Sequence, residues 1–254
     1  MLEFEKIDAG YGRTSVLHEV SFSLRPGRLT VMLGRNGSGK STLLSCANQE
    51  LPYQGLISFH GEDLALLSPR ERAKRVAILP QSVPAPHLSV EELAQFGRNP
   101  YLDLGRRLSR EDKRAVETAL WDADADSLRQ RCVATLSGGE RQRANLAMIL
   151  AQNAPVIVLD EPTAHMDPCH EAAFLGRISR LRREQKKTFL VILHDLNLAV
   201  AYADDIVVLD QGRIVFAGTT AQCLQEQVLE QTFQVCRFTA EKGRIFFSAA
   251  LPRE

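Results

Sequence analysis

The stretch Gly34-Arg35-Asn36-Gly37-Ser38-Gly39-Lys40-Ser41 decides the fold of this chain. It follows the apolar run 30–33, which is typical of a buried strand, and it precedes Thr42 and Leu43, which open a helix. A strand, a loop and a helix in this order are the context in which the pattern G-x-x-x-x-G-K-[ST] indicates a phosphate-binding loop. The sequence therefore predicts that residues 34–42 bind a nucleotide.

Each residue type in this loop has a chemical reason. The glycines permit backbone conformations that a β-carbon would forbid, so the loop N–H groups can surround phosphates at the positive end of the helix. Lys40 can reach the β- and γ-phosphates, and the Ser41 hydroxyl can bind Mg²⁺. The predicted nucleotide contacts in the loop are Gly34, Arg35, Asn36, Gly37, Ser38, Gly39, Lys40, Ser41 and Thr42.

The composition excludes several classes of protein. The 254 residues are 44% hydrophobic, and 31 basic residues balance 31 acidic ones, so no global charge favours nucleic acid as a partner. No apolar run approaches the roughly 20 residues that cross a bilayer, and the N-terminus lacks the layout of a signal peptide. Five cysteines without paired spacing argue against a disulfide framework. An ordinary protein with reduced thiols, in a cytoplasm, is expected.

Short apolar strands alternate with helical segments along the chain, which predicts a mainly parallel α/β sheet with an antiparallel edge near the N-terminus. Ser68, Ser89 and Ser109 each have the pattern of a capped helix start, and β-branched runs disappear over roughly 86–145, which predicts a helical insertion. The expected strands are 2–24 (interrupted by a loop at 9–13), 57–59, 76–79, 156–160, 189–193, 206–209 and 213–216, with a terminal hairpin at 235–247 and a long helix at about 169–186.

The strand 156–160 ends in two carboxylates, Asp160 and Glu161. Neighbouring side chains of a strand point in opposite directions. Asp160 can therefore hold the Mg²⁺ shell while Glu161 faces the γ-phosphate and polarises the attacking water.

A second anion site is predicted at Ser137-Gly138-Gly139-Glu140, where a helix cap and two glycines leave N–H groups bare at a helix start. This site cannot belong to the same nucleotide as the first. Together with the phosphate loop, the segment resembles the ATP-binding cassette of ABC transporters, whose signature residues 137–140 match. The resemblance covers residues 2 to 250.

The resemblance implies a single ABC ATPase domain, 1–254, with a P-loop NTPase (RecA-like) core, an antiparallel β subdomain and an inserted α-helical subdomain. Residues 1–85 and 146–254 would form the nucleotide-binding core and β subdomain, and 86–145 the helical subdomain.

It also implies roles for matching residues, with ATP and Mg²⁺ as cofactors. Tyr11 would stack on adenine, Gln81 would sense the γ-phosphate and Mg²⁺, and His194 would contact the γ-phosphate. Taken alone, these three also fit a packing tyrosine, an unremarkable glutamine and a strand-end histidine. The implied catalytic residues are Glu161, His194, Gln81 and Lys40. The implied metal ligands are Ser41, Gln81 and Asp160. Besides the loop, the implied nucleotide contacts are Tyr11, Ser137, Gly138, Gly139, Glu140 and Asp167.

Two copies would pair head to tail in this family, so residues 137–139 of one would close on the ATP held by Lys40 of the other. The chain departs from the family pattern at His165, where a small or aliphatic residue is usual; a tolerated surface substitution is favoured over an altered dimer interface. Histidines 18, 60, 87 and 170 show no ligand spacing and are assigned to the surface.

The segments 194–204 and 96–106 are similar to cassettes of bacterial importers for ferric siderophores, haem and cobalamin. An ATPase subunit for iron-chelate import is therefore expected, peripheral on the cytoplasmic face of the bacterial inner membrane. Its partners would be polytopic permease subunits and, indirectly, a substrate-binding protein, with no nucleic acid. A cobalamin or other metal-chelate importer is the alternative, and a cassette that acts on ribosomes or DNA is a further one.

Overall fold

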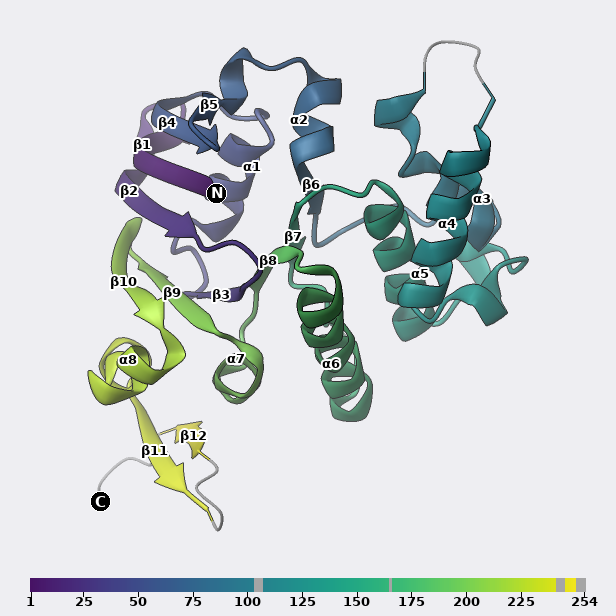
Figure 1. Ribbon diagram of the computed structural model, residues 1–254. Helices are drawn as coiled ribbons and strands as arrows, with labels where there is room; N and C mark the ends of the chain where they lie inside the picture. The colour runs from purple at the N-terminus through teal and green to yellow at the C-terminus, as the bar shows by residue number, and fades with distance from the viewer. Residues whose placement is uncertain (103–106, 165, 241–244, 250–254) are drawn as a thin grey trace. The chain divides into compact units, whose positions relative to one another are not determined.

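A computed structural model describes residues 1–102, 107–164, 166–240 and 245–249 (Figure 1). The chain divides into two compact units, one formed by 1–63 with 191–254 and the other by 64–190. The division falls within the strand β8 (Thr188–Ile192), which is buried along its whole length. The predicted helical insertion, 86–145, lies within the second unit.

The first unit contains two kinds of sheet. The strands near the N-terminus form an antiparallel four-stranded sheet in the order β2-β1-β4-β5, and Phe4 stacks on Phe22 across β1 and β2 with ring centroids 4.5 Å apart. Separately, β3 pairs parallel with β9, which pairs antiparallel with β10. The bounds are β1 Leu2–Tyr11, β2 Thr14–Leu24, β3 Leu29–Leu33, β4 Tyr53–Phe59, β5 Glu62–Asp63, β9 Asp205–Asp210 and β10 Arg213–Thr219.

Helices and a hairpin complete the first unit. The helix α1 (Lys40–Ala47) follows β3, and α7 (Leu196–Tyr202), α8 (Thr220–Gln225) and α9 (Val228–Phe233) come late in the chain. The strands β11 (Val235–Thr239) and β12 (Ile245–Ala249) pair antiparallel. Asn197 on α7 ties this hairpin to the unit, because its side-chain oxygen accepts a hydrogen bond of 2.7 Å from the Phe247 N–H.

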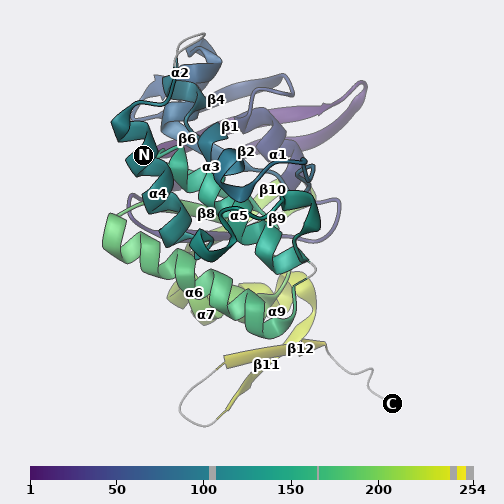
Figure 2. The ribbon, with the colours of Figure 1, turned by 90° about the vertical axis from the view of Figure 1, so that its right-hand side faces the viewer.

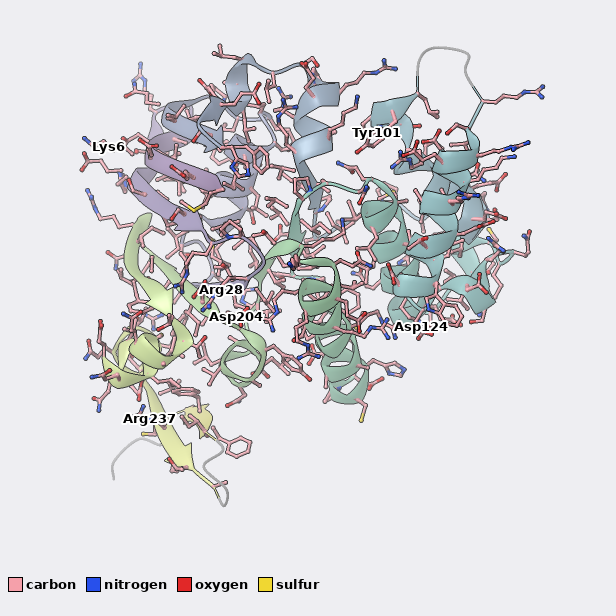
Figure 3. The ribbon with its side chains drawn as sticks, in the orientation of Figure 1. Lys6, Arg28, Tyr101, Asp124, Asp204 and Arg237 are labelled. Atoms are coloured by element: carbon pink, nitrogen blue, oxygen red, sulfur yellow. The ribbon has the colours of Figure 1, made fainter. Side chains whose placement is uncertain are left out.

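The two carboxylates that begin β9 also hold the first unit together. Arg25 and Arg28 both donate to the Asp205 carboxylate, which is only 5% exposed, and the pKa of Arg28 is raised by this hydrogen bond. The Leu29 N–H at the start of β3 donates to Asp204, 2.8 Å away, and Arg28 donates to the Asp204 carbonyl (Figure 3). These bonds fix the start of β3, the strand whose other end leads into the phosphate loop.

In the second unit β6 pairs parallel with β7, and α3, α4 and α5 pack on one another (Figure 2). The bounds are α2 Pro69–Arg75, β6 Val76–Leu79, α3 Val90–Phe96, α4 Arg110–Asp122, α5 Gly138–Ala151, β7 Val156–Asp160 and α6 Pro168–Gln185, with single 3₁₀ turns at Leu64–Leu66, Asn99–Tyr101, Asp126–Leu128 and Val133–Thr135.

A buried arginine just after α3 joins α4 through an ion pair and α5 through a hydrogen bond. The Arg98 Nε donates to Asp112, 2.9 Å away, and another guanidinium nitrogen donates to the Ala151 carbonyl at 2.8 Å. The guanidinium also lies over the Tyr101 ring, 3.8 Å from its centroid. Because both charged side chains are less than 10% exposed, this pair organises the helical part of the unit.

The sequence predicted most elements within two residues. Ser68, Ser89, Ser109 and Ser137 each form the complete capping box that the pattern indicates. The N-terminal strands form an antiparallel sheet of their own, which confirms the predicted antiparallel β subdomain; they are not an edge of the parallel sheet, as the strand pattern alone suggested. The predicted loop 9–13 is wrong because β1 continues through Tyr11 and only residues 12 and 13 turn. The helices α7, α8 and α9 had no prediction. The turn of the terminal hairpin, 241–244, lies outside the described residues.

Free thiols were also predicted correctly. All five cysteines are unpaired, and burial raises the pKa of Cys46 to about 11 and of Cys223 to about 12. These two thiols are therefore inert core residues.

Candidate nucleotide-binding site

The predicted phosphate loop lies between β3 and α1 in the first unit and is closed by backbone hydrogen bonds. The Ser38 N–H donates to the Arg35 carbonyl at 3.1 Å, and the Gly212 N–H donates to the Ser38 carbonyl at 3.0 Å. A β-carbon on Gly34 would lie 2.4 Å from the Leu209 carbonyl oxygen. Only glycine fits there, so the strand β9 sets the shape of the loop.

The remaining loop geometry suits an anion. Gly39 has a φ of 107°, in the region that favours glycine, and contributes no side-chain cap to α1. The first N–H groups of α1 therefore have no cap side chain as acceptor and face the loop, as in helix starts that bind phosphate.

The side chains of Lys40 and Ser38 show whether a nucleotide phosphate fits this loop. Lys40 is 6% exposed, and its ammonium donates to the carbonyls of Gly34 at 2.8 Å and Arg35 at 3.1 Å, which holds the charge over the loop. The Ser38 hydroxyl is buried and has no hydrogen-bond partner among the described residues. A buried orphan hydroxyl is costly, and a phosphate oxygen would satisfy it. The loop fits the ligand that its sequence predicts.

The first unit also carries two other predicted contacts, each at the end of a strand. Tyr11 is the last residue of β1 and is 55% exposed, so its ring is available for stacking. His194 follows β8 and is exposed, after Leu193, whose N–H donates to the Met32 carbonyl at 3.2 Å.

The predicted carboxylates lie in the second unit, at the end of β7. Asp160 is 8% exposed, whereas Glu161 is partly exposed and has a φ of 45°, which is unusual for a residue with a side chain. This left-handed backbone turns the chain away from the strand direction directly after Asp160. The two carboxylates thus have different environments, which come from the left-handed turn at Glu161 and not from strand alternation, because β7 ends at Asp160.

The structure brings Gln81 and Glu161 together although 80 residues separate them. The Gln81 amide donates to a Glu161 carboxylate oxygen across 2.6 Å. Gln81 follows β6, the neighbour of β7, so the pairing of these parallel strands places both side chains at the same edge. This contact joins a predicted metal ligand to the predicted catalytic carboxylate.

Ser137 and Glu140 shape the start of α5. The Ser137 side chain accepts from the Glu140 N–H, and the Glu140 carboxylate accepts from the Ser137 N–H at 2.9 Å. Hydrogen bonds from Ser137 and from Arg131 hold the pKa of Glu140 below its usual value. Ser137 therefore caps the helix beside Gly138 and Gly139, whose N–H groups lie at the helix start, where an anion can bind.

Asp167 is the N-cap of α6 and accepts from the N–H groups of Cys169 and His170. Its other carboxylate oxygen lies 2.5 Å from His170 Nδ1, and this hydrogen bond lowers the pKa of Asp167. A β-carbon on Gly139 would lie 4.0 Å from the His170 ring. His170 is exposed, as predicted, but it contacts a predicted site residue, which its spacing did not indicate. His60 and His87 are exposed, as predicted, and His18 is half-buried. His165 lies outside the described residues.

The predicted residues thus fall into two groups. The phosphate loop, Tyr11 and His194 belong to the first unit, and Gln81, Asp160, Glu161, Asp167 and residues 137–140 belong to the second. Sequence reasoning missed Leu209, which limits the size of residue 34, and His170. The Asp-Pro pair at 167 and 168, a cap followed by a proline at the first helical position, is the signal that would have placed His170 three residues after the cap.

Comparisons with known proteins identify the family. A model of the ABC transporter family matches residues 17–164. The chain is 38% identical to the "Probable siderophore transport system ATP-binding protein YusV" of Bacillus subtilis, over 93% of this chain and 87% of that protein. It is 40% identical to the "Hemin import ATP-binding protein HmuV" of Pseudomonas entomophila, over 92% of this chain and 93% of that protein. It is 36% identical to the "Ferric enterobactin transport ATP-binding protein FepC" of Escherichia coli, over 91% of this chain and 86% of that protein.

Solved structures agree with the fold. A nucleotide-free ATP-binding cassette of an ABC transporter superposes with a TM-score of 0.82 at 24% identity, over 92% of this chain and 97% of that one. An inward-facing structure described as a "metal-chelate type ABC transporter" superposes with a TM-score of 0.83 at 25% identity, over 99% of this chain and 98% of that one. The chain belongs to the ABC transporter family and is one of its ATPase subunits.

Proposed function

We propose that this chain hydrolyses ATP to power the import of an iron chelate, a ferric siderophore or haem, through a membrane permease. The observation that supports the cargo is the agreement among relatives: those named for siderophore, enterobactin and hemin transport each align with more than 90% of this chain. The aligned part includes the helical segment 86–145, the part expected to meet the permease, so the likeness extends beyond the ATP site.

The residues of the site have different proposed roles. Lys40, the loop N–H groups and Tyr11 hold the nucleotide. Ser41, Asp160 and Gln81 hold Mg²⁺, which shields the phosphate charge, and hydroxyl, carboxylate and amide oxygens are the ligands that this ion prefers. Glu161 orients the attacking water, and His194 contacts the γ-phosphate.

Two copies complete the site. Residues 137–139 form an anion site that lies outside the phosphate loop's own sequence, and a head-to-tail pair would close this segment of one copy on the ATP bound by Lys40 of the other, next to Asp167. The division into a core, 1–85 with 146–254, and a helical subdomain, 86–145, belongs to the same proposal. No helix of the described residues is long and apolar enough to span a membrane. We place the chain on the cytoplasmic face, bound to permease subunits that a substrate-binding protein supplies.

Co-purification from native membranes tests this function. A Glu161→Gln variant retains bound ATP and stays in the closed state, so it serves as bait in the presence of ATP and Mg²⁺. We expect a polytopic membrane protein in a one-to-one ratio, with ATPase activity of the wild-type assembly stimulated by a binding protein loaded with an iron chelate. The same assay with Lys40→Ala as bait gives the background without closed dimers.

Three other outcomes contradict parts of the proposal. Stimulation by a cobalamin-loaded or other chelate-loaded binding protein, with no response to iron chelates, replaces the cargo. Recovery of ribosomes or DNA-repair factors without a membrane protein replaces import altogether. A wild-type protein that hydrolyses no ATP removes the enzymatic assignment.

A further inference from the structure

A cavity of about 200 Å³ in the second unit lies beside the helices that start at the two segments expected to face the partner copy. Gly139 lines it from α5, and Met166 and His170 line it from the start of α6. The other charged residues around it are Asp124, Arg143 and Arg177. None of these three has a role in the proposed ATP site.

Asp124, labelled in Figure 3, hydrogen-bonds to two other helices at this cavity. It follows α4, and its carboxylate Oδ2 accepts hydrogen bonds of 2.9 Å from both Arg143 on α5 and Arg177 on α6. Its carbonyl accepts a further bond of 3.0 Å from Arg143. Its φ of 55° is left-handed, a conformation that aspartate and asparagine tolerate better than most residues.

The charge balance depends on this single carboxylate. Two guanidinium groups converge on one oxygen of Asp124; the Asp124 side chain is 56% exposed, whereas Arg143 is 30% and Arg177 19% exposed. Without the negative charge, two cations would face each other at a distance where like charges repel. The repulsion would act between α5 and α6.

The places of Arg143 on α5 and Arg177 on α6 show how the start of each helix depends on Asp124. Arg143 lies five residues after Gly138, about 7.5 Å along α5, and Arg177 lies nine residues after Pro168, about 14 Å along α6, at the usual rise per residue. A change in the spacing of the helices at these points therefore moves Gly138 and Gly139 relative to Asp167. We propose that Asp124 is a positioning residue, which clamps α5 to α6 so that residues 137–139 and Asp167 meet the partner copy's ATP in a fixed arrangement. This inference rests on the head-to-tail dimer proposed above.

The test uses Asp124→Asn, which keeps the left-handed backbone and the side-chain shape but removes the charge. Arg177→Gln probes the clamp from α6, and Glu184→Gln is the matched control, because Glu184 pairs with Arg180 on the surface of the same helix at 3.8 Å. In hydrogen exchange of the nucleotide-free protein, we expect Asp124→Asn to exchange several-fold faster at 137–141 and 167–171, with no change at the phosphate loop, 34–42.

Steady-state kinetics measures the functional side. Asp124→Asn is expected to lower kcat about tenfold and to leave the affinity for a fluorescent ATP analogue within twofold of wild type, since Lys40 and its loop lie in the other unit. Arg177→Gln combined with Asp124→Asn should lose no more than the worse single variant, because both remove one clamp. Glu184→Gln should behave as wild type.

Two results would overturn the clamp. One is unchanged exchange at 137–141 and 167–171 in Asp124→Asn. The other is a kinetic result, either a kcat of Asp124→Asn within twofold of wild type or a loss of ATP affinity equal to the loss of kcat. Failure of the proposed function looks different: the wild type itself would hydrolyse no ATP, while the exchange experiment would still report on the clamp.

Discussion

At the scale of the residue, Glu161 combines a strained backbone with a hydrogen bond to Gln81. A left-handed conformation at a residue with a side chain costs of order 1–3 kcal/mol and persists where the surroundings demand it. Here it separates the Glu161 side chain from the buried Asp160. The carboxylate is thus partly exposed and held by an amide, which suits the water-orienting role that we propose for it.

Glu161→Gln is therefore expected to bind ATP normally and to hydrolyse it at least a hundredfold more slowly, because an amide cannot accept the water's proton. The hydrogen bond with Gln81 can remain through the new side-chain oxygen. Size-exclusion chromatography with ATP and Mg²⁺ should show an accumulated dimer. Turnover at the wild-type rate would mean that another group is the catalytic carboxylate.

Gly34→Ala tests the loop geometry. The new β-carbon would lie 2.4 Å from the Leu209 carbonyl and 2.5 Å from the Ser38 hydroxyl, so the backbone must shift. We expect a loss of about 1–3 kcal/mol in the free energy of unfolding and at least a tenfold loss of ATP affinity by fluorescence titration.

Gly176→Ala is the control for this change. It lies inside α6, and its β-carbon would meet nothing within 4 Å. It should raise stability by up to about 1 kcal/mol through helix propensity and leave ATP affinity unchanged. Equal effects of the two substitutions would contradict the steric explanation.

Residue roles are predictable from sequence where local spacing carries the chemistry. The roles proposed for the loop 34–41 and for the acids at 160 and 161 rest on such spacing. The Asp124 clamp is not, because its three residues lie on separate elements and share no pattern. The Gln81 contact with Glu161 needed the pairing of β6 with β7, which a strand pattern alone does not specify.

At the scale of the element, the Arg98–Asp112 pair holds the helical part of the second unit. Burial works against the Asp112 carboxylate, but hydrogen bonds from Ser109 and Arg98 outweigh it, so the pKa of Asp112 lies below its usual value. A lowered folded-state pKa stabilises the protein fully above the unfolded value of 3.8 and loses that contribution as pH falls through the folded value.

Asp112→Asn is expected to cost about 3–5 kcal/mol of unfolding free energy at pH 7, because it leaves the buried Arg98 charge without its partner. The difference from wild type should shrink as the pH falls below about 4. Urea denaturation followed by circular dichroism at several pH values measures both. A difference that is small at pH 7, or that grows toward acid pH, would contradict this assignment.

Capped helices were the most predictable elements, since Ser68, Ser89, Ser109 and Ser137 each signal a start by chemistry within four residues. Sheet membership was the least predictable. The N-terminal strands alternate like any half-buried strand, and whether they extend a parallel sheet or form their own depends on partners far along the chain. In short helices such as α7, the spacing of apolar residues covers too few turns to indicate a helix.

At the scale of the whole molecule, the proposed head-to-tail dimer predicts that each copy supplies a phosphate loop to one ATP and residues 137–139 to another. A mixture of two inactive variants tests this arrangement most directly. Lys40→Ala removes the phosphate contact, with loss of nucleotide affinity and activity expected. Gly138→Asp places a negative charge in the second anion site, at a helix start that tolerates aspartate.

Each variant alone should have no measurable ATPase activity, in phosphate-release assays at protein concentrations that support dimers. In an equal mixture, half of the dimers would contain one complete site, so activity should return to at most about a quarter of wild type under random pairing. A mixture as inactive as its components would contradict a shared site, and retained ATPase activity in Lys40→Ala alone would contradict the role of the phosphate loop.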